Sequence, residues 1–272
     1  MHLQASSVIL TGATGGMGQA MVAALCAAGA RVLVVGRQED ALAQLTDRFG
    51  DQVISLQADL RLAADRAKVL EAARRLPDLN LLINAAGINQ FSLFESMDEQ
   101  AISDLIDTNL TASLQLTHTL LPLLKRAPQA CIVNIGSTFG AIGYPGFSTY
   151  CASKFALRGF SEALRRELAD TRVGVLYLAP RATQTDMNST QVNAMNAALQ
   201  VRSDSPEQVA AALIKALQQD LQEIHLGWPE CLFVRLNSLL PRLVDVALRR
   251  QLSTVQRFAN HAQAPVVMEK PR

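Results

Sequence analysis

The chain has 272 residues, of which 49% are hydrophobic and 18% charged, a composition typical of a globular protein with a substantial buried core. The formal net charge is +1 and only 5% of the residues are aromatic. The sequence therefore lacks the basic and aromatic patterning of nucleic-acid-binding proteins, and we expect no nucleic-acid partner.

The four cysteines form no C-x-x-C pair and have no histidines at metal-binding spacing, so free thiols and no metal site are predicted. Met1 to Gln4 lead directly into an apolar run, without the segments of a secretory signal. No apolar run reaches the length of roughly eighteen residues that a membrane-spanning helix needs. We therefore expect a cytoplasmic protein, with peripheral membrane contact left open.

Short apolar runs rich in β-branched residues alternate along the chain with longer segments of helical periodicity. The predicted strands span residues 7–10, 31–35, 52–56, 79–83, 130–135, 173–178 and 223–226. The predicted helices span residues 17–28, 39–49, 61–76, 98–125 and 150–169, and a further helix begins at Ser205, followed by Pro206 and by Gln208 in a capping box.

Strands that alternate with helices of this length indicate βαβ units and a parallel sheet. The strands are apolar throughout, as expected when helices cover both faces of the sheet. The expected fold class is α/β, a Rossmann-like doubly wound parallel sheet of about seven strands with helices on both faces. Ligands of such sheets bind beyond the carboxyl ends of the strands.

A glycine-rich turn, Thr11 to Gly18, joins the first strand to the first helix. Glycines at such a turn let backbone N–H groups approach a pyrophosphate, and the helix N-terminus favours its negative charge. The second strand ends in Gly36 and Arg37. An arginine there favours the 2′-phosphate of NADP, although Glu39 and Asp40 follow closely.

Tyr150 and Lys154 are four residues apart at the start of a predicted helix, so both side chains lie on one helical face. A nearby ammonium is expected to lower the pKa of the tyrosine, which is otherwise near 10. Ser137 follows the strand at 130–135, where a hydroxyl could hold a substrate oxygen. On spacing alone, a tyrosine and a lysine in this arrangement also occur by chance.

Taken together, these motifs resemble the classical branch of the short-chain dehydrogenase/reductase family from about Ser7 to Trp228. Thr11 to Gly18 matches T-G-x-x-x-G-x-G and also fits the pattern of the extended branch, T-G-x-x-G-x-x-G. Further matches are Asp59-Leu60, Asn84-Ala85-Ala86-Gly87, Asn109, the stretch from Ile132 to Ser137, and the Tyr150–Lys154 pair.

The resemblance implies a catalytic tetrad of Asn109, Ser137, Tyr150 and Lys154, with Asn109 anchoring a water in a proton relay to the lysine. It implies a nicotinamide dinucleotide cofactor, and Arg37 alone makes NADP(H) the expected one, with NAD(H) less expected. The expected cofactor-binding residues are Gly12, Thr14, Gly16, Met17, Gly18, Arg37, Asp59, Leu60, Asn84, Ala86, Gly87, Tyr150, Lys154, Pro180, Thr183 and Thr185.

The chain departs from the family pattern at Arg181, which replaces the glycine after Pro180. Its side chain could crowd the pocket, contact a phosphate or point outward. The segment 184–203 lies where the family places a substrate lid and contains Met187, Val192, Met195 and Leu199, which favours a hydrophobic substrate. The loop before Tyr150 could add apolar wall through Phe139, Ile142, Tyr144 and Phe147.

Beyond residue 230, leucines recur at helical spacing, and Arg235, Arg242 and Arg249 are seven residues apart. This segment is expected to pack on its own domain, with subunit pairing, a cover over the substrate site, or contact of 230–257 with an anionic membrane as alternatives. Pro241 is expected to start or kink a helix. We predict a dinucleotide-binding and catalytic domain at 1–229, an amphipathic helical extension of it at 230–258, and a flexible tail at 259–272.

The sequence therefore predicts an oxidoreductase that moves a hydride between NADP(H) and a carbonyl/alcohol pair, with Tyr150 as acid/base. The expected substrate is a hydrophobic ketone or 3-oxo compound, and the resemblance implies a homo-oligomer. The alternatives are a non-catalytic NADP-binding sensor and a nucleotide-sugar epimerase or dehydratase, for which the chain leaves little room.

Overall fold

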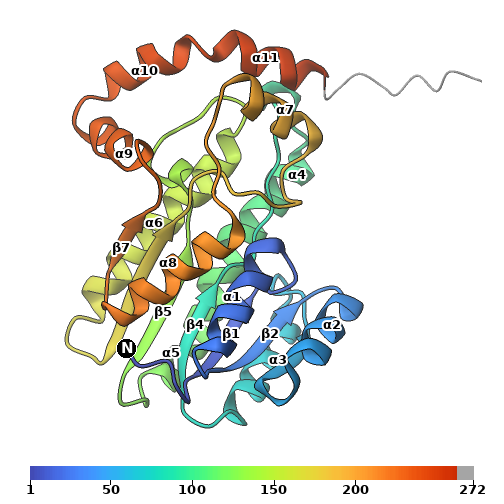
Figure 1. The fold of residues 1–272 in the computed structure, drawn as a ribbon, viewed down its shortest axis with the longest axis vertical. Coiled ribbons are helices and arrows are strands. Elements are labelled where there is room, and N and C mark those ends of the chain that lie inside the picture. Colours follow the sequence, from blue (N-terminus) through green and yellow to red (C-terminus); the bar gives the residue numbers. More distant parts are fainter. Residues whose placement is uncertain (262–272) are drawn as a thin grey trace, which may run out of the picture.

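The computed structural model describes residues 1–261, in which one seven-stranded sheet lies between layers of helices (Figure 1). Every strand pair is parallel and the spatial order is β3-β2-β1-β4-β5-β6-β7. The strands are β1 (Ser7–Thr11), β2 (Arg31–Gly36), β3 (Val53–Gln57), β4 (Leu79–Asn84), β5 (Ala130–Ile135), β6 (Val173–Ala179) and β7 (Glu223–His225).

The strand order reverses between β1 and β4, because the chain first moves outward to β3 and then restarts on the other side of β1. Ligands of doubly wound sheets bind at such a switch point, beyond the carboxyl ends of the strands. The predicted fold class is confirmed. The predicted strands agree with the observed ones to within a residue or two at each end.

Two apolar layers hold the helices against the sheet. On one face lie α1 (Gly16–Ala27), α2 (Glu39–Phe49) and α8 (Pro206–Gln218), and on the other lie α3 (Ala63–Arg74), α5 (Ala112–Leu124) and α6 (Ser148–Glu167). Alternate strand residues point to opposite faces, so Val8 and Leu10 pack in the first layer and Ile9 in the second. This double burial explains why the strands are apolar throughout.

The start of α8 follows the predicted capping box. The Ser205 hydroxyl accepts a hydrogen bond from the Gln208 backbone N–H, and the Gln208 side chain accepts one from the Ser205 N–H. Pro206 occupies the first helical position, where its missing N–H costs nothing.

The segment 98–125, predicted as one long helix, is divided in the structure. It consists of α4 (Glu99–Ile106), a π-helical turn η3 (Asp107–Thr111) and α5. The wider turn carries Asn109, which is fully buried and hydrogen-bonded to backbone outside the helix. These tertiary hydrogen bonds outweigh regular helical geometry, and π-helical turns are frequent at functional sites.

The predicted C-terminal extension is three helices in the structure: α9 (Glu230–Leu239), α10 (Pro241–Arg249) and α11 (Leu252–His261). Pro241 starts α10 at a sharp corner after Leu239. Helix α11 continues beyond the expected boundary at 258, because Ala259 is buried. Residues 262–272 of the expected tail lie outside the described residues.

The three helices form an arch across the end of the molecule beyond the carboxyl ends of the strands (Figure 1). Shorter elements lie beneath it, namely the lid helix α7 (Thr190–Ala198) and the short turns η2 (Phe94–Ser96) and η4 (Thr138–Gly140) at loops. The short turn η1 (Gly50–Gln52) lies at the opposite end of the sheet, where it joins α2 to β3. Within residues 1–261, no helix is both long enough and apolar enough to cross a bilayer.

Candidate active site

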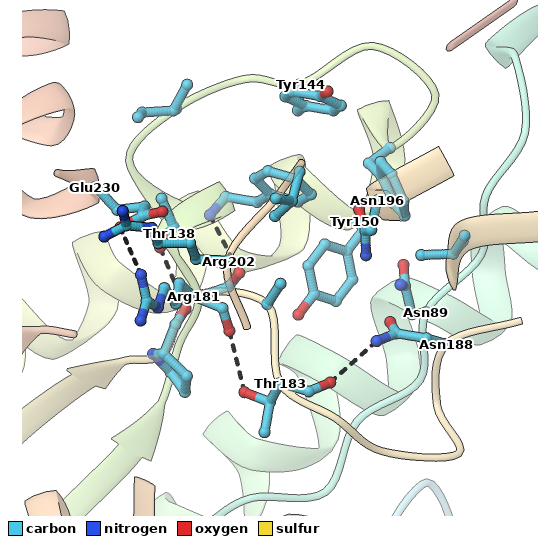
Figure 2. Close-up of a pocket in the computed structure, with 18 of the residues that line it drawn as sticks. Asn89, Thr138, Tyr144, Tyr150, Arg181, Thr183, Asn188, Asn196, Arg202 and Glu230 are labelled. Atoms are coloured by element: carbon cyan, nitrogen blue, oxygen red, sulfur yellow. Dashed lines mark hydrogen bonds and ion pairs between the residues drawn. The ribbon is translucent and has the colours of Figure 1, made fainter. Parts of the chain in front are cut away.

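A cavity of about 320 Å³ lies beyond the carboxyl ends of β5 and β6, under α7, α9 and α10. Ser137 and Tyr150 line it, together with Met17, Pro180, Thr183 and Thr185 from the predicted cofactor residues. Figure 2 shows the Tyr150 side chain in this cavity, with Thr183, Asn188 and Asn89 around it.

Ser137 owes its position to the end of β5 and to a tyrosine beneath it. Its hydroxyl accepts a hydrogen bond from the Phe139 N–H at 3.1 Å, which begins η4. The Tyr177 hydroxyl accepts a long hydrogen bond of 3.5 Å from the Ser137 N–H. Gly136 admits the Tyr177 ring, because a Cβ at Gly136 would lie 2.2 Å from Tyr177 Cζ. Tyr177 is thus a positioning residue that the sequence reasoning missed.

Lys154 lies one turn along α6 from Tyr150, as predicted, and it is buried behind the tyrosine. Its ammonium donates a hydrogen bond to the Ile135 carbonyl at 3.0 Å and lies 5.7 Å from the centroid of the Tyr150 ring. Burial lowers the pKa of Lys154 to about 8, because removal from water disfavours the charged form.

The predicted lowering of the Tyr150 pKa is not what the structure gives. Burial raises the pKa of Tyr150 to about 12, and a hydrogen bond with Ser137 offsets this only in part. Lys154, whose ammonium lies 5.7 Å from the ring centroid, is not among the groups that shift the pKa of Tyr150. Tyr150 is therefore a neutral phenol at physiological pH, which suits it to donate a proton.

Asn109 is fixed by the segment that follows β4. Its Oδ1 accepts from the Ile88 N–H at 2.7 Å, and its Nδ2 donates to the Ile88 carbonyl at 2.9 Å and to the Ser153 hydroxyl at 3.2 Å. A Cβ at Gly87 would lie 3.2 Å from Asn109 Oδ1 and 3.7 Å from Lys154 Nζ. The structure therefore brings Asn109 and Lys154 to the same glycine, while the relay water stays a prediction.

The glycine turn packs tightly against the loop after β4. Gly12 has a positive φ of +67°, and a Cβ there would lie 2.7 Å from Ala86 Cα. The Thr11 hydroxyl accepts from the N–H groups of Ala85 and Ala86 at 3.0 and 3.1 Å. A Cβ at Gly18 would lie 2.2 Å from the Gly12 carbonyl oxygen. These contacts hold the backbone of the glycine turn after β1 directly against the backbone of the loop after β4.

This turn fits an anionic group. No side chain caps the N-terminus of α1, and its first turn carries no acidic residue. Gly16 faces Thr185, whose Cγ2 would lie 3.1 Å from a Cβ at Gly16. A helix N-terminus opened by glycines offers free N–H groups and a favourable dipole to a pyrophosphate. Thr14 lies nearby, against Gly36 at the end of β2.

Other predicted cofactor residues do not line the cavity. Arg37 is exposed after β2, at the far side of the switch point from Tyr150. The pKa of the Asp59 carboxyl is lowered, mainly by hydrogen bonds from Arg61 and slightly by the charge of Arg37. The Leu60 side chain belongs to the buried core. Their cofactor contacts stay predictions.

Asn84 is also buried in the sheet rather than exposed to a ligand site. Its Nδ2 donates to the Thr117 hydroxyl at 3.0 Å and to Asn134 Oδ1 at 2.8 Å. Asn134 in turn donates to the Ser161 hydroxyl at 2.8 Å. This buried chain joins β4, β5, α5 and α6, so the side chain supports the sheet beneath the site.

Arg181 points away from Tyr150, across the edge of the cavity. Its guanidinium pairs with Asp204 at 2.6 Å. It also pairs with Glu230 at 3.2 Å, and Arg181 and Glu230 are both labelled in Figure 2. Gly227 leaves room for it, because a Cβ there would lie 2.5 Å from Arg181 Cδ. The side chain therefore does not point out into solvent: it lies at the rim of the cavity, is only 15% exposed, and ties the loop after β6 to α9.

The remainder of the cavity wall is largely apolar. The loop residues Phe139, Ile142, Tyr144 and Phe147 line it as expected, with Phe139 and Tyr144 stacked at 4.9 Å between ring centroids. From the lid, Met187, Val192 and Met195 also line it, whereas Leu199 packs on the adjoining cluster.

Several lining residues were not foreseen. The arch contributes Phe233, Val244, Ala247, Leu248 and Gln251, and the loops contribute Asn89 and Asn188. Asn89 Oδ1 is buried and has no hydrogen-bond partner within residues 1–261, so it offers an acceptor to a bound molecule. The only sequence signal for Asn89 is a polar residue two positions after Gly87.

Comparison with known proteins places these features in a family. The family model for short chain dehydrogenases matches residues 6–196. The chain belongs to the short-chain dehydrogenase family. Nodulation protein G of Rhizobium sp. (strain N33) is 35% identical over 74% of this chain and 84% of that protein. The 3-oxoacyl-[acyl-carrier-protein] reductase FabG of Escherichia coli (strain K12) is 31% identical over 69% of this chain and 77% of that protein.

Solved structures of short-chain dehydrogenases share the fold. One from Burkholderia cenocepacia J2315, in complex with NADP, superposes with a TM-score of 0.80 at 24% identity and covers 91% of this chain and 99% of that one. Another from Burkholderia phymatum, in complex with NAD, gives 0.81 at 20% identity over 89% and 96%. The chain is thus a short-chain dehydrogenase/reductase, and the family model ends within α7, before the arch.

Proposed function

We propose that this protein transfers a hydride between NADP(H) and a hydrophobic ketone or 3-oxo compound and its alcohol, with Tyr150 as the acid/base. The observation that carries the proposal is the position of Ser137 and Tyr150 in an apolar cavity, with the ammonium of Lys154 buried behind them. The order Asn109, Ser137, Tyr150 and Lys154 supports an enzyme over a non-catalytic sensor.

The nicotinamide, when bound, supplies or accepts the hydride. In the reducing direction, Ser137 and Tyr150 hold the carbonyl oxygen, and the phenol of Tyr150 gives its proton to the oxygen that becomes the alcohol. A pKa of about 12 keeps that proton on Tyr150 until the oxygen becomes basic. Lys154 supplies positive charge behind the ring as the phenolate forms, and the apolar wall excludes water.

Arg37 supports NADP over NAD. It stands directly after β2, where a carboxylate would bind the ribose 2′-hydroxyl and an arginine can bind a 2′-phosphate. We expect Arg37→Ala to raise the KM for NADPH roughly tenfold or more, the loss of one charge-assisted hydrogen-bonded pair, and to leave the KM for NADH unchanged. Equal wild-type use of both cofactors would contradict this assignment.

The substrate class rests on the cavity wall. Aromatic and methionine side chains surround Tyr150. Two arginines also line the cavity: Arg181 is paired with Asp204 and Glu230, and Arg202 is exposed at its edge. The name of the Escherichia coli relative, a 3-oxoacyl reductase, supports a carbonyl one carbon removed from a second carbonyl. The homo-oligomeric state stays a prediction, which light scattering measures.

The decisive test is a panel of alkyl ketones and 3-oxo thioesters, with NADPH absorbance as the signal. We expect turnover that rises with alkyl length, and a fall in kcat of roughly 10²–10⁴ for Tyr150→Phe, the range for loss of a general acid. Tyr144→Phe is the matched control, because its hydroxyl bonds to Gln251 at 2.7 Å. Unchanged activity in Tyr150→Phe would refute the mechanism.

A further inference from the structure

The inner side of the arch formed by α9, α10 and α11 is packed against the rest of the molecule. Val234 and Val244 are buried against Ala141 and Ile142, and Val255 of α11 is buried against the lid and the aromatic loop. This inner side forms the roof of the cavity. Nothing within residues 1–261 covers the outer side of α10 and the corner that precedes it.

That outer side is unusually apolar. Leu239 is 79% exposed, Leu243 57% and Val246 55%, and Trp228, just before α9, is 63% exposed. Leu243 and Val246 lie three residues apart on one face of α10, opposite the buried Val244. Isolated exposed apolar residues are ordinary, whereas a cluster on one helix and its flanking corner indicates a binding surface.

Arginines accompany this apolar face. Residues 231–261 contain five arginines and one acidic residue, Asp245, although the whole chain carries a formal charge of only +1. Arg242 and Arg249 on α10, and Arg250 directly after its last residue, are exposed. At helical spacing Arg242 and Arg249 flank Val246 on one side and Arg250 lies on the other, so charge and apolar surface share one face.

Two kinds of partner could cover such a face, and the charge decides between them. A two-fold contact with a second copy would bring two faces rich in arginine together, with only Asp245 on α10 to offset their charge. The core of a protein interface is also depleted in charged residues. An anionic lipid surface instead neutralises the guanidinium groups, while their apolar stems and the leucines enter the interfacial region. Trp228 is of the residue type that favours this depth.

We propose that the outer face of the arch, formed by Leu239, Leu243, Val246, Arg242, Arg249 and Arg250, docks on a bilayer that contains anionic phospholipid. The arch then lies between the bilayer and the cavity, because the opposite side of α10 is the roof. Apolar substrates dissolved in the bilayer would start next to the site. This consequence for the substrate rests on the proposed function, whereas the docking itself does not.

Vesicle flotation with the full chain tests the docking without any substrate. The probes are vesicles of phosphatidylcholine alone and of phosphatidylcholine mixed with phosphatidylglycerol. We expect the protein to float only with the anionic vesicles and to be released by salt, because screening weakens surface attraction. Absence of binding to the anionic vesicles, or equal binding to both, overturns the proposal.

Two double variants separate the apolar and the charged contributions. Leu243→Glu with Val246→Glu should lower vesicle partitioning at least tenfold. The variant loses two apolar contacts with the bilayer, and its two new carboxylates are repelled by the anionic lipid. Ile54→Glu with Leu62→Glu is the control. These side chains, on the edge strand β3 and just before α3, are 52% and 55% exposed. Equal losses in the two variants would overturn the proposal.

Arg242→Gln with Arg249→Gln should lower partitioning into anionic vesicles by roughly fivefold for each arginine removed. Arg31→Gln with Arg75→Gln, both exposed and distant from the arch, should leave it nearly unchanged. Light scattering tests the alternative of a second copy. If the wild type does not bind vesicles, and the Leu243→Glu, Val246→Glu variant has a different mass in solution from the wild type, the face is assigned to a contact between two copies instead.

Discussion

The floor and the roof of the cavity are built in different ways. The floor lies at the ends of β5 and β6 and holds polar groups that are buried and hydrogen-bonded, with Lys154, Asn109 and Ser137 each fixed by backbone. The roof is the arch, which contributes mainly apolar side chains and is attached at one edge through Arg181. The difference suggests that the floor carries the chemistry and the roof selects the substrate.

The largest expected effect concerns the floor. Lys154→Met should reduce kcat by roughly 10²-fold or more, because the positive charge behind Tyr150 disappears. The same change should increase the free energy of unfolding at pH 7 by about 1–2 kcal/mol, since a buried ammonium is costly even with its hydrogen bond to Ile135. Denaturant unfolding monitored by circular dichroism measures the stability.

The stability difference between the wild type and Lys154→Met should depend on pH. The folded-state pKa of Lys154 is lowered to about 8 from 10.5, so the folded wild type loses the proton before the unfolded chain does. Wild-type stability should therefore rise between about pH 8 and 10.5, and the advantage of the Met variant should shrink over that window. Lys215→Met, at an exposed site, controls for the loss of a lysine as such. A gap between wild type and Lys154→Met that stays constant with pH would contradict the assignment.

The attachment of the roof should give an intermediate effect. Arg181→Ala leaves Asp204 and Glu230 without the guanidinium that joins them. The loss of this partly buried ion pair should lower the free energy of unfolding by about 2 kcal/mol. We expect the KM for an apolar ketone to rise roughly tenfold while kcat changes little, since the floor is untouched. Steady-state kinetics measures both parameters.

The control for the roof is Arg158→Ala, which removes an ion pair of similar length, 2.9 Å to Glu223, at the other side of β7. Its side chains are about twice as exposed as those of the Arg181 pair. It should leave KM and kcat unchanged. A fall in kcat rather than a rise in KM for Arg181→Ala would mean that floor and roof are not separable in this way.

The same division explains what the sequence could predict. The residues of the floor can be predicted from short local sequence patterns. These are a hydroxyl residue just after an apolar strand, and Tyr150 and Lys154 one helical turn apart. The roof depends on contacts between distant residues, such as Arg181 with Glu230, 49 positions away, or Val255 with the buried residues of the lid helix α7. No local pattern predicts such pairs. The sequence therefore left the orientation of Arg181 open, and it gave a cover over the substrate site only as one alternative for the helical segment after residue 230.

Two misjudgements on the floor have the same origin. The π-helical turn at Asn109 exists because Ile88, from another loop, binds the amide on both sides. The pKa of Tyr150 is raised because the loop, the lid and the arch together exclude water. Spacing placed the lysine correctly, but it could not tell how dry the surroundings of the phenol would be.

The smallest expected effect is a change in the lid alone. Met187 lines the cavity yet is 40% exposed, so Met187→Ala should scarcely change stability. If the lid and roof select apolar substrates, kcat/KM for a long alkyl ketone should fall roughly fivefold, the loss of about 1 kcal/mol of apolar contact. A ketone too short to reach the lid should be unaffected. Leu221→Ala, similarly exposed but outside the cavity, should leave kcat/KM unchanged for both ketones. An equal fall in kcat/KM for both ketones in Met187→Ala would assign the selectivity to the floor rather than to the roof.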